Sequence, residues 1–281
     1  MTAGARRRRL VRLPQYGALV LYMLFLAFPL LWMLSTSLKS SSELVSVTPS
    51  LLPSSPKWSN YSTVLREQGL TRSAWNSLRV SLASTVLVIL VGLPAAYALA
   101  RFRSRLRTAA LGWILVSQVF PLILVVIPLF LLLKQLHLFN TLPGLVAVYL
   151  VWSLPFALWM LQGYVASVPV ELEEAAAIDG AGRLRTLSNV VLPLLLPGLV
   201  ATAMFTFISA WNEFFFALVL IQSPERATLS LTLARFLGAE GQVQLGPLAA
   251  GSLLATVPSL VFFAFLQRRL TSGLLAGAVK G

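Results

Sequence analysis

The sequence predicts an all-α protein, a bundle of about six helices that cross a lipid bilayer. Of its 281 residues, 57% are hydrophobic and only 11% are charged, whereas a soluble domain carries about a quarter charged residues. Apolar runs of at least 19 residues recur along the chain, and a helix of that length crosses the hydrocarbon core. Six such runs and their connections use nearly all of the length, so we expect a polytopic protein surrounded by membrane lipid.

The chain is strongly basic, with 22 Lys and Arg residues against 9 Asp and Glu. In a soluble protein this balance would suggest a nucleic-acid partner. In a polytopic membrane protein, basic residues in the cytoplasmic loops orient the helices instead. No basic module with interleaved aromatic residues is present. We therefore expect no nucleic acid among the partners.

The first element is an apolar run from Tyr16 to Leu34, which follows the basic cluster Arg6–Arg9. This order imitates a secretory signal peptide, but the run is too long and no small-residue cleavage site follows it cleanly. Its 19 residues cover about 28 Å as a helix, so we interpret them as an uncleaved first span. The next segment, Ser35 to Trp75, is rich in Ser and Pro and is expected to lie outside the membrane.

Five further apolar runs follow. We expect spans at Leu78–Ala100, Ala109–Leu133, Leu142–Val165, Leu194–Ile221 and Gly246–Leu266. Proline interrupts several of them, for example at Pro94, Pro121 and Pro258. Such breaks survive in a membrane where neighbouring helices or water satisfy the freed backbone groups. These positions therefore indicate a packed bundle.

The distribution of basic residues predicts that both termini lie in the cytoplasm. With the N-terminus inside, the inner segments hold 14 Lys and Arg residues and the outer segments hold 7, and segments rich in these residues stay in the cytoplasm. The expected organisation is a cytoplasmic N-terminal tail (1–14), a transmembrane domain (15–266) and a cytoplasmic C-terminal tail (267–281). A cytoplasmic loop (166–193) joins the fourth and fifth spans.

The chain lacks the motifs of several kinds of catalytic site. It contains no cysteine, a single histidine (His137), no G-x-x-x-x-G-K-[ST] phosphate loop, and no H-E-x-x-H or G-x-S-x-G signature. These absences argue against a thiol enzyme, a metalloenzyme and ATP hydrolysis by this chain. We therefore predict a protein with no catalytic residues, metal or cofactor of its own.

One acidic residue, Glu213, lies deep within an expected span, in the run Trp211-Asn212-Glu213. A charge at that depth costs about 2.5–3.5 kcal/mol, so Glu213 should face a partner, a cavity or water. These residues either line a translocation path or subunit interface, or form a polar latch between helices. Self-sufficient secondary transporters usually carry several intramembrane charges and internal repeats. The single acid and the lack of an evident repeat disfavour that alternative class.

The loop between the fourth and fifth spans predicts a short helix of about 11 residues. Pro169 suits its first turn, acidic residues complement its positive N-terminal end, alanines extend it, and Gly180 and Gly182 stop it. One helical face carries Glu171, Glu174, Ala175 and Ile178. Small residues let another backbone approach, and an acid can pair with Arg or Lys. The face therefore suits the docking of another protein.

The same loop resembles that of ABC-importer permeases. Glu174-Ala175-Ala176, then Gly180 after three residues and Val190-Val191-Leu192-Pro193 after nine more, is similar to their E-A-A-x3-G-x9-I-x-L-P motif, with Val190 in place of Ile. Shorter features resemble the second permease subunit of maltose-type carbohydrate importers, which has the type I ABC-importer permease fold. They are Asn76-Ser77-Leu78, Trp211-Asn212-Glu213, and the ending from Gln267 to Gly281.

This resemblance implies a complex in the cytoplasmic (inner) membrane of a bacterium. Two permease subunits would form the translocation path, a dimer of ATP-binding subunits would dock beneath them, and an extracytoplasmic solute-binding protein would deliver the substrate. ATP would bind the partner subunits. The expected substrate is a sugar, an oligosaccharide or disaccharide, with glycerol-phosphate or another polar solute as the alternative.

The resemblance also implies roles for individual residues. The loop helix would be the coupling helix, seated in a cleft of the ATPase, with Glu174 paired to a basic group and Gly180 shaping the turn. The expected docking residues are Glu174, Ala175, Ala176, Asp179 and Gly180. By the same resemblance the C-terminal tail would touch the ATPases, and the outer loop near 222–246 would touch the solute-binding protein.

Overall fold

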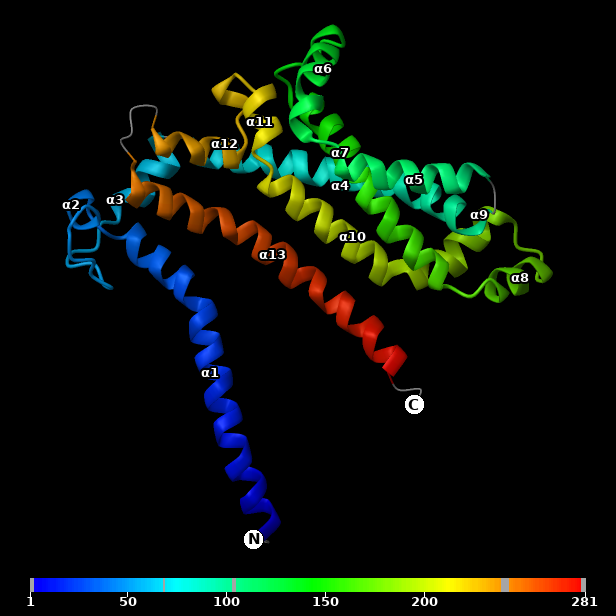
Figure 1. Ribbon diagram of the computed structural model, residues 1–281, viewed down its shortest axis with the longest axis horizontal. Helices are drawn as coiled ribbons and strands as arrows, with labels where there is room; N and C mark the ends of the chain where they lie inside the picture. Colours follow the sequence, from blue (N-terminus) through cyan, green and yellow to red (C-terminus); the bar gives the residue numbers. More distant parts are fainter. Residues whose placement is uncertain (1–2, 68, 103–104, 239–242, 279–281) are drawn as a thin grey trace. The chain divides into compact units, whose positions relative to one another are not determined.

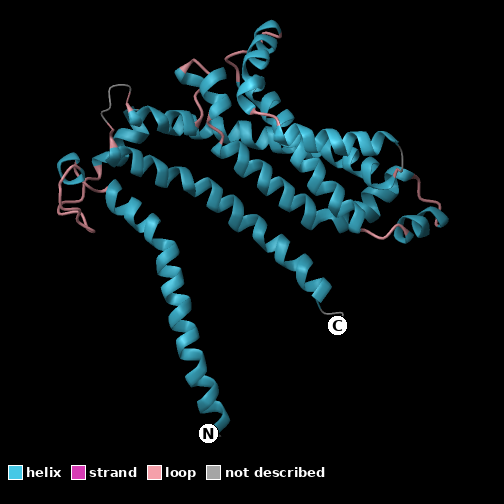
Figure 2. Ribbon diagram, in the orientation of Figure 1, coloured by secondary structure: helices cyan, strands magenta, loops and turns pink. Residues whose placement is uncertain are grey.

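The computed structural model describes residues 3–67, 69–102, 105–238 and 243–278, and within these ranges every regular element is helical (Figures 1 and 2). The long helices are α1 (Ala3–Ser37), α4 (Leu70–Arg101), α5 (Arg105–Val119), α6 (Leu122–Gln135), α7 (Leu142–Ser167), α10 (Leu192–Asn212) and α13 (Leu245–Ala278). The short helices are α2 (Ser41–Leu44), α3 (Ser59–Ser62), α8 (Glu171–Ile178), α9 (Arg183–Thr186), α11 (Phe215–Leu220) and α12 (Leu229–Ala234). The π-helical turns are η1 (Thr63–Glu67) and η2 (Leu187–Val191), and the 3-10 turns are η3 (Pro224–Arg226) and η4 (Arg235–Leu237).

Five helical segments in the described residues are long and apolar enough to cross a membrane. They are Gln15–Ser37, Leu70–Arg101, Leu142–Ser167, Arg183–Asn212 and Leu245–Gln267. A bent pair, Arg107–Val119 and Leu122–Gln135, whose axes differ by 101°, is either a sixth, broken span or a re-entrant loop. This arrangement confirms the expected polytopic all-α class.

The third span is not the single run from Ala109 to Leu133 that the sequence suggested. The chain breaks at Pro121, which adopts an extended conformation (φ −62°, ψ 120°) before α6. Proline lacks an N–H group and disfavours a helical conformation at the residue before it. The break therefore follows from Pro121, whereas Pro128 lies inside α6 without ending it.

The chain forms two compact units. The first comprises Met1–Leu70 with Leu233–Thr256. In it, none of the side chains in the most apolar stretch of Gln15–Ser37 is buried, so this span presents its apolar surface to the surroundings. The segment after α1 is fixed at Asn60, whose side-chain amide donates to the carbonyls of Ser37 (2.9 Å) and Lys39 (3.0 Å).

The second unit comprises Thr71–Thr232 with Val257–Gly281. Helix α7 lies at its centre and contacts α5, α10 and α11. A buried apolar cluster joins α4, α6, α7, α10, α11 and α12 through Val80, Leu133, Leu145, Val148, Tyr149, Ala210, Phe216, Ala217, Leu220 and Leu231, among others. This cluster is the core that holds the broken helices of the unit together.

The motif Asn76-Ser77 anchors the start of α4 to a distant loop. The Asn76 amide donates to the carbonyls of Glu225 (2.9 Å) and Ala227 (3.1 Å). The Ser77 hydroxyl accepts from the N–H of Leu229 (2.8 Å), the first residue of α12. A hydroxyl in this position satisfies one of the free N–H groups at a helix start.

The fifth span differs from the expected Leu194–Ile221 at both ends. The helical segment begins at Arg183 and passes through η2 before Pro193. A π-turn provides room where a proline ring and its missing N–H would disturb a regular α-helix. The helix ends at Asn212, since Glu213 is extended (φ −66°, ψ 131°). Glu213 therefore lies at a break between α10 and α11.

The coupling loop forms a helix shorter than the expected 11 residues. Helix α8 has 8 residues, because Val168 is extended before Pro169 and residues 169 and 170 form only a turn. Gly180 ends it as expected, with φ +79°. Gly182 does not stop α8, since it is instead the extended residue before α9. The side chains of the expected tails, 3–14 and 268–278, and residues 239–242 of the outer loop lie outside the described part.

Candidate functional site

Helix α8 is ended by paired backbone hydrogen bonds around Gly180. The N–H of Gly180 donates to Ala177 (3.0 Å), and the N–H of Ala181 donates to Ala176 (2.9 Å). This is the Schellman arrangement, which needs a residue in the left-handed conformation after the helix end. Glycine adopts that conformation at little cost. The turn that follows α8 is therefore specified by Gly180.

The outer face of α8 is open. Glu174, Ala175, Asp179 and Gly180 are exposed, and Ala176 is partly buried. Ile178 is 87% exposed, and Leu184 of the adjoining α9 is 84% exposed. Two large apolar side chains are therefore open to the surroundings at this end of the loop. Four of the five expected docking residues are thus exposed, and the fifth, Ala176, is partly buried.

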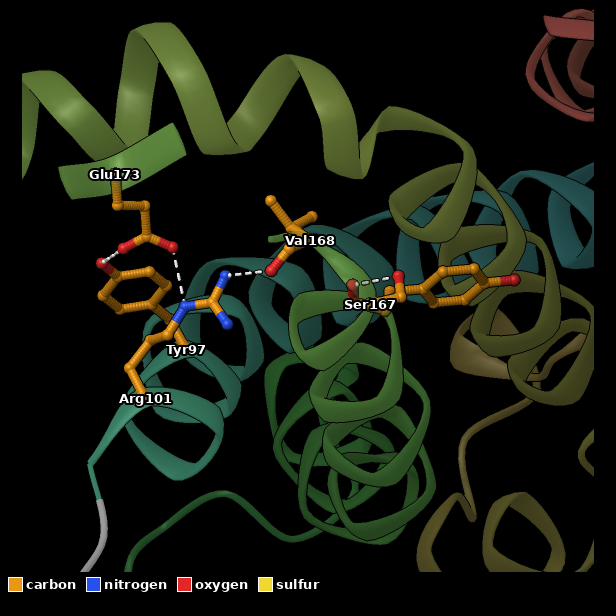
Figure 3. A network of polar contacts seen from close by, with 6 residues as sticks. Tyr97, Arg101, Ser167, Val168 and Glu173 are labelled. Atoms are coloured by element: carbon orange, nitrogen blue, oxygen red, sulfur yellow. Dashed lines mark hydrogen bonds and ion pairs between the residues drawn. The ribbon is translucent and has the colours of Figure 1, made fainter. Parts of the chain in front are cut away.

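The opposite face of α8 is fixed to α4 by a polar network, drawn in Figure 3. Both carboxylate oxygens of Glu173 are used: the Tyr97 hydroxyl donates to one (2.5 Å), and Arg101 Nε donates to the other (2.7 Å). Arg101 also donates through Nη2 to the carbonyl of Val168 (2.9 Å), the residue that follows α7. The Arg101 and Glu173 side chains are only 11% and 13% exposed.

Sequence reasoning did not find this network. In the sequence, Arg101 is only one of several basic residues between the second and third spans, and Glu173 is only one of several acids near a helix start. The partners are separated by 72 and 76 residues, so no local spacing indicates them. The available signal was that Glu173 and Glu174 must lie about 100° apart on a helix, so one of them had to face away from the docking surface.

The second group of expected site residues does not share one environment. Trp211 is buried and lies nearly parallel to Phe207, with ring centroids 5.9 Å apart. Asn212 is exposed, and its amide donates to the carbonyl of Ile208 (2.9 Å). The structure therefore brings together Trp211 and the aromatic core, and leaves Asn212 at the surface.

Glu213 follows Trp211 and Asn212 in the chain and comes just before α11. It accepts the Tyr149 hydroxyl of α7 (2.6 Å) and the backbone N–H groups of Phe216 (2.8 Å) and Ala217 (3.2 Å). A carboxylate is favoured at the positive N-terminal end of a helix, where N–H groups lack partners. These contacts account for an acid in an apolar segment, and they join α7 to the break between α10 and α11.

No group of three or more His, Cys, Asp or Glu side chains with the spacing of a metal site occurs among the residues that the structure describes. Two polar clusters of the second unit are each built on a single acid, Glu173 or Glu213, and its hydrogen-bond donors.

The fold is similar to that of a solved transporter. The chain matches a bacterial ABC transporter involved in the import of the acidic polysaccharide alginate with a TM-score of 0.75 and 24% identity, over 95% of this chain and 98% of the other. The architecture is that of a type I ABC-importer permease.

Comparisons of sequence agree with this fold. Residues 89–274 match the family described as binding-protein-dependent transport system inner membrane component. The chain is 57% identical to a putative ABC transporter permease protein of Streptomyces antibioticus over 229 residues, 82% of this chain and all of the other. It is 37% identical to a diacetylchitobiose uptake system permease of Streptomyces coelicolor (95% and 96% covered). It is 36% identical to a trehalose transport system permease of Mycobacterium tuberculosis (90% and 92% covered).

These matches confirm the expected resemblance to ABC-importer permeases of the carbohydrate type, which are transport subunits and not enzymes. The chain belongs to the family of binding-protein-dependent transport system inner membrane components, as a multi-pass permease of the inner membrane.

Proposed function

We propose that this chain is the permease subunit of an ATP-driven importer that carries an oligosaccharide or disaccharide into the cell by alternating access. Relatives that cover at least 90% of the chain are named for the uptake of diacetylchitobiose and trehalose. Those names favour a sugar over glycerol-phosphate or another polar solute. Because the two sugars differ, they support the substrate class and leave the particular sugar to experiment.

The observation that carries the coupling role is the open face of α8. An acid, small residues and Ile178 at 87% exposure form a surface that fits a cleft with a basic group. The chain contains no phosphate-binding loop of its own, so in this proposal ATP binds to partner subunits. We infer that a dimer of ATP-binding subunits docks here, on the cytoplasmic side, with Glu174, Ala175, Ala176, Asp179 and Gly180 at the contact.

The other partners follow from the same proposal. A second permease subunit would complete the path, with Trp211, Asn212 and Glu213 near the path or the subunit interface. An extracytoplasmic solute-binding protein would meet the outer loops. One of these loops is well fixed, because the Asn140 side-chain oxygen accepts the N–H groups of Gln222 (2.9 Å) and Ser223 (3.0 Å).

In this mechanism α8 acts as a lever. ATP binding closes the ATPase dimer, the docked helices move with it, and the spans reopen toward the outside to accept the solute. A partner can shift this equilibrium only by binding one state better than the other. Contacts on α8 must therefore differ in strength between the inward-open and outward-open states.

Two variants of α8 test the docking role. Glu174→Lys reverses the charge at the proposed contact. Gly180→Pro is incompatible with φ +79°, because proline holds φ near about −65°. We expect both to abolish uptake in a reconstituted complex while the chain stays in the membrane at its normal level.

Gly180→Asn is the matched control. Asparagine adopts the left-handed conformation more readily than other residues with a side chain, and a Cβ at this position meets no atom within 4 Å. This variant keeps the turn, so it should retain more uptake than Gly180→Pro even though Gly180 lies at the proposed contact. Normal uptake by both Glu174→Lys and Gly180→Pro would refute the docking role. ATP-independent uptake by the purified chain in liposomes would instead establish a secondary transporter.

A further inference from the structure

Glu173 connects the coupling loop to a span that is distant in sequence. Helix α8 follows α7 directly and leads through α9 into α10, so its covalent links run to the fourth and fifth spans only. The ion pair with Arg101 adds a link to α4, the second span. In Figure 3 the Glu173 side chain extends from α8 toward Tyr97 and Arg101 at the end of α4.

The contacts of Glu173 are of the strong kind. Hydrogen bonds with an ionised partner are shorter and about twice as strong as neutral ones, and the two from Tyr97 and Arg101 measure 2.5 and 2.7 Å. With both charged side chains at most 13% exposed, water and salt screen the pair less than a surface pair. The pair therefore fixes the position of α8 relative to α4 more firmly than an exposed loop contact would.

Arg101 holds three segments at once. As the last residue of α4, it bonds Glu173 in α8 and the carbonyl of Val168 at the end of α7. Arginine can do this because its guanidinium carries several donors in fixed directions. A displacement of α8 that left α4 behind would break the bonds from both Tyr97 and Arg101 together.

A buried apolar cluster, here called the apolar seat, packs next to the network. Val165, Val168, Val191 and Leu195 form a buried cluster, and Leu93, Tyr97 and Ala100 of α4 pack against it. Tyr97 therefore belongs both to the apolar seat and to the polar network. Packed groups of this kind transmit displacement instead of absorbing it, because protein interiors are close-packed.

We propose that Tyr97, Arg101 and Glu173 form a clamp that makes α4 move together with α8 during the transport cycle. This rests on the proposed docking role of α8. The three are positioning residues: they do not contact the ATPase or the solute, but pass the displacement of α8 to the second span. In this proposal Glu173 links α8 to the second span of the permease, whereas Glu174 contacts the ATPase.

The first test measures solute uptake and ATP hydrolysis together in proteoliposomes that contain the complete importer. Glu173→Gln removes the ion pair. We expect uptake per ATP hydrolysed to fall about five- to tenfold, the low end of the range for coupling between sites, while the ATP-binding subunit still co-purifies. An unchanged ratio would overturn the clamp.

Ser167→Ala is the matched control. Its hydroxyl donates to the carbonyl of Tyr164 within α7 (2.8 Å), and in Figure 3 Ser167 lies next to Val168, away from Tyr97 and Glu173. The change removes a hydrogen bond of the same region without touching α4, so the ratio should stay unchanged. Failure of the ATP-binding subunit to co-purify even with the unaltered chain would instead refute the docking proposal on which the clamp depends.

The second test asks whether α4 and α8 really move as one body. The chain has no cysteine, so the double variant Tyr97→Cys/Glu173→Cys carries two unique thiols that a short bismaleimide can join. We expect the unlinked variant to be uncoupled and the linked one to regain coupled uptake. If linking abolishes the remaining uptake, α4 and α8 must separate during the cycle, and the clamp is wrong.

Discussion

At the scale of single residues, the neighbours Glu173 and Glu174 face different surroundings. Successive residues on an α-helix point about 100° apart, so Glu173 is held by α4 at 13% exposure while Glu174 is exposed. The family-like motif includes only Glu174. An acid next to a motif can therefore be structural, and its orientation on the helix decides which role it has.

Glu213 illustrates the same point inside an apolar segment. The expectation that an acid there needs a partner is met by Tyr149 and by two backbone N–H groups of α11. Its location at a helix break was not expected. The break exposes free N–H groups, and these give the carboxylate partners that a continuous helix would have used internally.

Glu43 of α2 supplies a prediction about pH. Its carboxylate accepts the hydroxyl of Ser54 and the backbone N–H groups of Ser40 and Ser54, and these bonds lower its pKa from 4.5 to about 2. A carboxyl with a lowered pKa in the folded state stabilises that state above the unfolded pKa. The stabilisation of this loop is therefore complete above about pH 4.5 and is lost as the pH falls to about 2.

A spin label at Ser55→Cys reports the order of this loop, since Ser55 is exposed and no other thiol is present in the chain. We expect label mobility to rise between pH 4.5 and 2. With Glu43→Gln added, mobility should be high and independent of pH across the same range. Identical profiles with and without Glu43→Gln would show that another group controls the loop.

At the scale of elements, the contact of α7 with α10 depends on Gly198. A Cβ added at Gly198 would lie 2.3 Å from Cγ of Tyr164, and 2.5 and 2.7 Å from the ring's two Cδ atoms. Gly198→Ala therefore forces the ring or the helices apart, and such overpacking costs about 1–3 kcal/mol. Thermal unfolding of the purified chain in detergent measures the loss.

Two variants accompany that measurement. Gly163→Ala changes a glycine of α7 whose added Cβ would meet no atom within 4 Å, so it should be neutral or stabilising by up to about 1 kcal/mol. In a Tyr164→Ala background, Gly198→Ala should cost little further stability, because the clashing ring is absent. Equal losses in Gly198→Ala with and without Tyr164 would point to a different contact.

The elements also show what the sequence could and could not predict. Apolar length identified the spans, and the left-handed Gly180 ended α8 as expected. The breaks were harder, because Pro121 ends a helix while Pro94 and Pro128 lie inside one. The same residue type gives different outcomes when tertiary packing satisfies the freed groups in one place and not in another.

Long-range contacts lie beyond such patterns altogether. The proposed docking surface was inferred from local residues of one loop, whereas Arg101 and Glu173 of the proposed clamp are bonded across 72 residues. Periodicity and motif spacing describe neighbours along the chain. They give no distance between two helix ends, so the contacts of the proposed clamp could be identified only from the folded structure.

At the scale of the whole molecule, the number of membrane crossings depends on whether the bent pair α5–α6 crosses the bilayer. Asn76 at the start of α4 and Asn140 before α7 both bond to the segment 222–227. Arg101 at the end of α4 bonds Val168, just after the end of α7. Helices α4 and α7 therefore run in the same direction, so the pair between them must return the chain from one end of the second unit to the other. On this argument we expect the pair to cross the membrane as one broken span and not to form a re-entrant loop.

A labelling experiment on whole cells checks both this crossing and the orientation. Ser55 and Gly182 are exposed and separated in sequence by α4, the bent pair and α7. Three crossings place them on opposite sides of the membrane, whereas a re-entrant pair would place them on the same side. The excess of basic residues on the α8 side predicts that Gly182 lies in the cytoplasm. We expect a membrane-impermeant maleimide to label Ser55→Cys in intact cells and Gly182→Cys only after permeabilisation. Labelling of both in intact cells would make the pair re-entrant, and the reverse pattern would place α8 outside, where no ATP-binding subunit could reach it.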